Sequence, residues 1–103
     1  MKLVSIDYLP GCELEVLGLV KGAVVYSKSF GKDFMAGMKN LVGGEIKGYT
    51  EMLADARAIA TKRMADEAEA LGADAVINVR YGSSSVMQSA AEVIAYGTAV
   101  KIK

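Results

Sequence analysis

Sulfur-containing side chains are the first residues in this 103-residue sequence that could do chemistry. The chain has one cysteine, Cys12, and no histidine. Thiolate and thioether sulfur bind soft ions such as Cu(I), which makes Cys12, Met35 and Met38 the candidates for a heavy-metal site. The two methionines lie one helical turn apart, which is also the spacing of core methionines. We therefore expect no metal centre within one chain. If the chain does bind a heavy metal, these three residues are the only candidates, and they are weak ones.

Gly43 and Gly44 are the first candidates for binding a small ligand. They precede a predicted helix, where unpaired backbone N–H groups can hold an anion or a carbonyl group. Glu45 opposes an anion there because it brings negative charge to the first turn, and the spacing is not that of a P-loop. The alternative is steric, with two glycines that let the chain turn sharply into the helix.

Arg80 and Glu92 are charged residues within otherwise apolar strand patterns. An unpaired charge on a half-buried strand is costly, so these two are expected to pair with each other or across a subunit boundary. Arg80 could also grip a ligand carboxylate, which makes the pair a second candidate for ligand binding. A structural ion pair or plain exposure to solvent is the alternative.

Composition argues against several classes of function. Without histidine, Cys12 and the serines at 83–85 have no evident general base, so we expect no enzyme and no cofactor. Twelve basic and twelve acidic residues balance, which argues against nucleic acid and anionic membranes as partners. No apolar run reaches the roughly 20 residues needed to cross a bilayer. We therefore expect a cytoplasmic protein.

One long helix must position these residues. Residues 45–71 are rich in strong helix formers and contain no proline, and Gly72 ends them. Apolar residues recur every three or four positions at Ile46, Tyr49, Leu53, Ala56, Ala60 and Met64. Elsewhere on the helix, Lys62–Asp66 and Arg63–Glu67 are spaced as i,i+4 pairs. At about 1.5 Å per residue the helix is roughly 40 Å long, which exceeds the diameter of a 100-residue domain. We expect a neighbouring subunit to cover it.

Strands are predicted on both sides of this helix. The alternation and β-favouring residues place them at 2–8, 13–20, 23–27, 75–81 and 86–103, the last range as one long or two short strands. Gly18 and Gly22 indicate a bulge or a close backbone approach. Pro10 and Gly11 predict a turn, rather than the cleavage site of a lipoprotein signal that the following Cys12 superficially suggests.

The remaining segments complete the predicted domain. Residues 33–41 are expected to form a short helix capped by Asp33, and 82–85 a loop. The alternation in 75–81 places Val79 and Tyr81 on one face and Asn78 and Arg80 on the other. A single α+β domain over 1–103 follows, with a mainly antiparallel sheet and one long helix in two layers.

The apolar content suggests self-association. Hydrophobic residues make up 52% of the chain. A chain this short buries only about two-thirds of the surface it exposes when unfolded, so one small core cannot hide so much apolar side chain. We therefore expect a homo-oligomer.

Several segments, taken in order, resemble the YbjQ-like family, a group of small uncharacterised bacterial and archaeal proteins often labelled "putative heavy-metal-binding". The segments are Gly18 and Gly22, Val42-Gly43-Gly44-Glu45 with Tyr49, Ala56-Arg57, Ala60, Arg63-Met64, Gly72-Ala73-Asp74-Ala75-Val76-Ile77, Arg80 and Ala95-Tyr96-Gly97-Thr98-Ala99-Val100. The resemblance spans nearly the whole chain. It implies a dodecin-subunit-like fold that assembles into a ring-shaped homo-oligomer, a pentamer, and it implies no established activity.

The expected function is that of a non-enzymatic structural or binding module. The alternative is a binder of a small ligand or a soft heavy-metal ion at sites between subunits.

Overall fold

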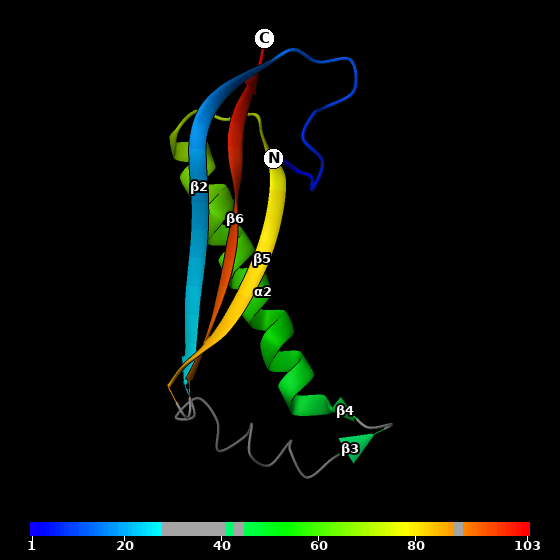
Figure 1. The fold of residues 1–103 in the computed structure, drawn as a ribbon, viewed down its shortest axis with the longest axis vertical. Coiled ribbons are helices and arrows are strands. Elements are labelled where there is room, and N and C mark those ends of the chain that lie inside the picture. The colour runs from blue at the N-terminus through cyan, green and yellow to red at the C-terminus, as the bar shows by residue number, and fades with distance from the viewer. Residues whose placement is uncertain (28–40, 43–44, 88–89) are drawn as a thin grey trace.

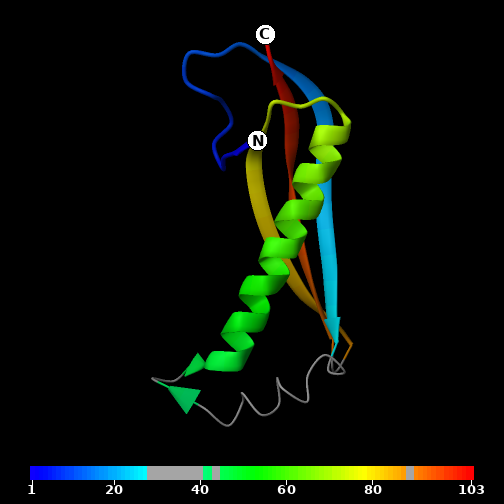
Figure 2. The same ribbon diagram turned by 180° about the vertical axis from the view of Figure 1, so that it is seen from behind.

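The computed structural model describes residues 1–27, 41–42, 45–87 and 90–103. Its elements are β1 (Lys2–Leu3), β2 (Leu14–Ser27), β3 (Leu41–Val42), β4 (Glu45–Ile46), α2 (Lys47–Ala70), β5 (Ala75–Met87) and β6 (Ala90–Ile102). A four-stranded sheet has the order β1-β5-β6-β2, and β3 pairs with β4 separately. Helix α2 lies across one face of the sheet (Figures 1 and 2). The predicted α+β layering is therefore confirmed.

The sheet is mixed and long. β5, β6 and β2 pair antiparallel, whereas β1 pairs parallel with β5 at the sheet edge. The molecule measures 52 × 26 × 17 Å, so it is elongated along the strands and the helix. Its radius of gyration of 16.5 Å exceeds the roughly 13 Å typical of a 100-residue domain.

Helix α2 ends as its sequence predicts. Gly72 has a φ of +80°, and its N–H donates to the carbonyl oxygen of Glu69. The Ala73 N–H donates to the carbonyl oxygen of Ala68, which completes a Schellman motif, and the partly buried Ala73 packs against the core that contains Ala68. The helix begins at Lys47, so Glu45 lies in β4 rather than in the first helical turn.

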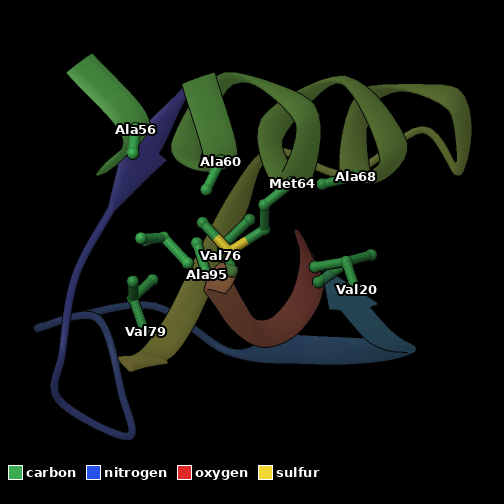
Figure 3. Close-up of a cluster of buried hydrophobic side chains, with 10 residues drawn as sticks. Val20, Ala56, Ala60, Met64, Ala68, Val76, Val79 and Ala95 are labelled. Carbon is green, nitrogen blue, oxygen red and sulfur yellow. The ribbon is translucent and has the colours of Figure 1, made fainter. Parts of the chain in front are cut away.

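The core lies between α2 and the sheet. Ala56, Ala60, Met64 and Ala68 recur along one side of the helix and are all buried (Figure 3). They pack against the sheet residues Val20, Val76, Val79, Val93, Ala95 and Ala99. Met64 is completely buried, which stabilises the fold by about 1.5–3 kcal/mol relative to an exposed side chain. The predicted apolar face of the helix is thus confirmed where side chains are described.

Strand β2 is continuous, so the predicted division into strands 13–20 and 23–27 is wrong. Both glycines nevertheless have the predicted roles. Gly18, at a φ of +143°, lies in the bulge where the register with β6 shifts. A Cβ at Gly22 would collide with the Ala60 carbonyl oxygen and the Met64 nitrogen, so the helix passes directly over the strand backbone. Pairing with β6 continues through Gly22 because the close approach leaves the strand hydrogen bonds intact.

Strand β5 departs from the predicted alternation at Asn78. This residue has a φ of +54°, a conformation that asparagine tolerates, and the register with β6 shifts there. As a result Val76 and Val79 both pack under α2, whereas Ile77 packs on the other face. The extra residue inverts the in–out order beyond this point, so the expected sharing of one face by Asn78 and Arg80 is not found.

The predicted loop at 82–85 is also wrong. These residues lie within β5, and they pair with β6 residues from Ile94 to Ala91. A glycine and three serines have weak strand propensity, but the hydrogen bonds to a long neighbouring strand override it.

The N-terminal segment covers part of the sheet face opposite α2. Leu9 is buried there against Ala75, Ile77 and Val100. The Cys12 N–H donates to the Leu9 carbonyl oxygen, and Gly11 has a φ of +74°, so the predicted turn at Pro10 and Gly11 is confirmed. The predicted strand 2–8 is shorter, because β1 contains two residues and the chain then contacts β5 through individual hydrogen bonds.

The predicted helix 33–41 falls outside the described residues except for Leu41, which lies in β3.

Candidate functional site

A large part of the sheet face opposite α2 is not covered by the N-terminal segment. Leu19, Val25 and Tyr96 are 70%, 51% and 40% exposed there. The half-buried Ala23 and Ile94 lie opposite each other between them. We call these five residues the uncovered sheet surface. It is apolar, and it lies on one face because the register aligns Leu19 with Thr98, Ala23 with Ile94 and Val25 with Glu92.

Charged residues lie within and beside this surface. Lys21 and Arg80 flank Tyr96 from the two neighbouring strands. The Arg80 guanidinium donates to the carbonyl oxygens of Ser5, at 2.8 Å, and Val79, at 3.0 Å. Arg80 is therefore held against the N-terminal segment by backbone carbonyl groups.

Glu92 lies apart from Arg80. Arg80 is opposite Tyr96, whereas Glu92 is opposite Ser84 and Val25. Four residues along a strand correspond to about 13 Å, so the two charged groups do not pair within one chain. Glu92 is half-buried, and within the described part of the chain its carboxylate makes no ion pair.

Two edges of the sheet are open among the described residues. β2 is an edge strand over its whole length, and β5 has no partner on its outer side beyond the region contacted by the N-terminal segment. Open edges present unpaired N–H and C=O groups that can pair with another chain. The two edges lie on opposite sides of the sheet (Figure 1).

A hollow of about 150 Å³ lies between α2 and the sheet, toward the N-terminal half of the helix. Its lining comprises Leu53, Arg57, Tyr81, Gly82, Ser83 and Val93. Here the helix swings away from β5 (Figure 2), so the space beneath it is incompletely filled. None of these residues was among the ligand candidates expected from sequence. One signal was present: positions three and four residues from Arg57 on the helix contain no carboxylate.

The sulfur and glycine candidates do not form a site among the described residues. Cys12 is exposed, and its thiol donates to the Pro10 carbonyl oxygen at 3.6 Å. Gly43, Gly44, Met35 and Met38 lie outside the described residues. In the ranges that the structure describes, no group of three or more His, Cys, Asp or Glu residues is placed to hold a metal ion.

No helix within the described residues is long and apolar enough to cross a membrane.

Comparison with known proteins identifies the family. A family model described as "Putative heavy-metal-binding" matches residues 1–103. A UPF0145 protein from Clostridium novyi is 61% identical over 102 residues, which cover 99% of each chain. A UPF0145 protein from Helicobacter hepaticus is 62% identical over 99% of this chain and 98% of its own. The chain therefore belongs to this YbjQ family of uncharacterised proteins.

A solved structure supports the fold. The crystal structure of a protein of unknown function from Pediococcus pentosaceus, of the DUF74 family, superposes with a TM-score of 0.72. It covers 100% of this chain and 98% of the other chain at 17% sequence identity. At that identity the likeness concerns the fold alone.

Among the described residues, the side chains of a single copy do not form a set of ligands that fits the heavy-metal description of the family. Soft ions require several thiolate, thioether or imidazole ligands. This chain has no histidine and one cysteine, which is exposed, and Met64 is buried within the apolar core.

Proposed function

We propose that the protein is a homo-oligomeric structural module without catalytic activity, assembled as a ring of five copies. The observation that carries this proposal is the uncovered sheet surface, where Leu19 is 70% exposed and Val25 is 51% exposed on one face. Several large apolar side chains exposed on one face of a small domain are typical of an interface between proteins.

The charges around this surface favour a second copy as the partner. Glu92 has no ion-pair partner within the described part of its own chain, and Lys21 is an exposed cation on the same face. Because one face has both positive and negative side chains, the cations of one copy can pair with the carboxylate of another copy. In this arrangement Glu92 pairs across the subunit boundary, as one alternative from the sequence analysis expected.

The open edges favour a ring over a two-fold dimer. A cyclic ring needs two different surfaces that fit each other, because each copy contacts its neighbour head to tail. The outer edges of β2 and β5 are different strands on opposite sides of one sheet. β2 and β5 also run in the same direction, since both are antiparallel to β6. Pairing of these edges between copies would satisfy their unpaired backbone groups.

Native mass spectrometry of the purified protein tests the assembly. Five chains of 10.9 kDa give about 55 kDa, and we expect this species at micromolar protein concentration. A monomer under these conditions would contradict the proposal, and another closed number of copies would contradict the pentamer.

A pair of substitutions tests the surface. Leu19→Lys places a charge on the uncovered sheet surface, and we expect it to shift the protein to smaller species, because the lysine would be buried without a partner. Leu71→Lys makes the same change at a residue 49% exposed beyond the end of α2, so it is the control and should leave the assembly intact. If the two variants formed assemblies of the same size, the uncovered sheet surface would not be part of the interface.

A further inference from the structure

We propose that the hollow between α2 and β5 binds a small monocarboxylate with a short apolar tail. This site goes beyond the proposed assembly and involves none of the residues expected from sequence to bind a ligand. Its walls come from three elements of one chain, namely α2, β5 and β6. The experiment on it can therefore fail without affecting the test of the oligomer, and the reverse also holds.

Arg57 supplies an uncommitted positive charge. The chain has three arginines, and two of them are engaged with backbone carbonyl oxygens. Arg63 donates to Ala23 at 2.6 Å, and Arg80 donates to Ser5. Arg57 makes no hydrogen bond or ion pair through its guanidinium within the described part of the chain, and yet it lines the hollow. A guanidinium offers two parallel N–H donors to a carboxylate.

Two hydroxyl groups connect the Arg57 backbone to β5. The Thr61 hydroxyl donates to the Arg57 carbonyl oxygen at 2.6 Å, and it lies 2.8 Å from the Tyr81 hydroxyl. Since the Thr61 proton is already used, the Tyr81 hydroxyl must donate to Thr61. These two hydrogen bonds tie the helix to β5 beside the hollow, so the guanidinium starts from a fixed backbone.

Ser83 adds a second donor, and the remaining surface is apolar. The Ser83 hydroxyl makes no hydrogen bond to another described residue, and Ser83 lines the hollow from β5. Leu53 and Val93, which belong to or pack against the core, supply apolar contacts. One cation, one free hydroxyl and an apolar wall match a monocarboxylate with a hydrocarbon tail, whereas a phosphate dianion would require more donors.

The size of the hollow limits the ligand. A volume of about 150 Å³ is small for a ligand site, because the pockets of drug-sized ligands have about 300–1,000 Å³. A carboxylate with a tail of about three carbon atoms, such as butanoate, matches this volume. We expect a Kd of about 1 mM for so small a ligand, held by one bidentate contact and a small apolar area.

Saturation-transfer NMR and isothermal titration with sodium butanoate test the site. Butylammonium has a similar tail with the opposite charge and is the ligand control. We expect butanoate to bind and butylammonium not to bind. Equal binding of the two compounds would overturn the proposal, because it would show only adsorption to apolar surface. Failure of butanoate to bind at about 50 mM, well above the expected Kd, would also overturn it.

Variants locate the binding. Arg57→Gln should weaken butanoate binding at least about tenfold, and Ser83→Ala about threefold, because each removes a donor to the carboxylate. Lys62→Gln removes an exposed cation of the same helix that pairs with Asp66 at 3.0 Å, and it should leave the affinity unchanged. Circular dichroism verifies that each variant is folded. Wild-type affinity in Arg57→Gln would place butanoate elsewhere and overturn the proposal.

Discussion

The two faces of the sheet differ in cover rather than in composition. Leu19 and Val20 are neighbours in β2 and are both apolar, but Leu19 is 70% exposed and Val20 is completely buried. Val20 packs under α2 with Met64, whereas Leu19 lies on the face where the N-terminal segment covers only one end. An apolar residue in this strand is therefore a core residue or an interface candidate according to the face on which it lies.

This difference shows what the helix contributes. Met64 and the buried alanines of α2 close one face within a single chain. The opposite face has Leu9 as its buried anchor at one end and no comparable cover over Val25 or Tyr96 among the described residues. The long helix and the surplus of apolar residues thus have separate consequences, because the helix completes the core and the surplus remains on the other face.

Substitution of Gly22 should have the largest effect on this contrast. Gly22→Ala places a methyl group against the Ala60 carbonyl oxygen and the Met64 nitrogen, so α2 must move away from β2. We expect the free energy of unfolding to fall by about 3 kcal/mol, measured by urea denaturation. Ala23→Val adds bulk at the next position on the uncovered face, and in the Leu19→Lys background, where the copies are expected to be separated, it should change stability by less than about 0.5 kcal/mol. If both variants lost a similar amount of unfolding free energy, the two faces of β2 would be packed equally closely.

Asn78 is the point at which β5 exchanges its faces, and its substitution should have an intermediate effect. Asn78→Ala puts a residue that avoids positive φ at +54°, so we expect a loss of about 1 kcal/mol in the free energy of unfolding. Asn78→Gly, which adopts this conformation freely, should not show that loss. If alanine were tolerated as well as glycine, backbone conformation would not explain why Val76 and Val79 share the helix side.

Two strand glycines offer the smallest and most direct comparison. A Cβ at Gly82 would make an ordinary contact of 3.5 Å with Ile94 on the face opposite α2. Gly82→Ala should therefore stabilise the protein by about 0.5 kcal/mol, because alanine loses less backbone entropy on folding. At Gly97 a Cβ would lie 2.7 Å from Val76 Cγ1 and 2.9 Å from the Ile77 carbonyl oxygen, so Gly97→Ala should destabilise it. Thermal denaturation would measure the effect of each substitution on stability. If both substitutions changed the stability in the same direction, the contrast between the two faces would be contradicted.

Local features of the fold could be predicted because they depend on residues close together in the chain. The helix followed from its composition and periodicity, and Gly72 ended it at the expected place. The predicted Lys62–Asp66 pair is present at 3.0 Å because i,i+4 residues are neighbours on any helix. Arg63, predicted to pair with Glu67, instead donates to Ala23, a contact across 40 residues of sequence that helical spacing cannot indicate.

The candidate site was less predictable. Arg80 and Glu92 lie within strands as predicted, but the strand register separates them and brings Arg80 to Ser5. The lining of the hollow was missed because Arg57, Tyr81 and Ser83 come from elements whose packing angle cannot be read from periodicity. The serine segment was expected to be a loop, so no side chain in it was placed beside the helix.

The amino-acid sequence by itself determined the long helix, its buried side, the turn at Pro10 and Gly11 and the irregular backbone at Gly18. These features follow from backbone sterics and from side-chain spacing within a few residues. Only the tertiary structure decided that β2 and β5 are continuous, that Asn78 inverts the alternation, and which apolar residues remain uncovered. Those outcomes depend on pairing between β2, β5 and β6 and on where α2 crosses them, because hydrogen bonds and packing between distant segments outweigh local propensity.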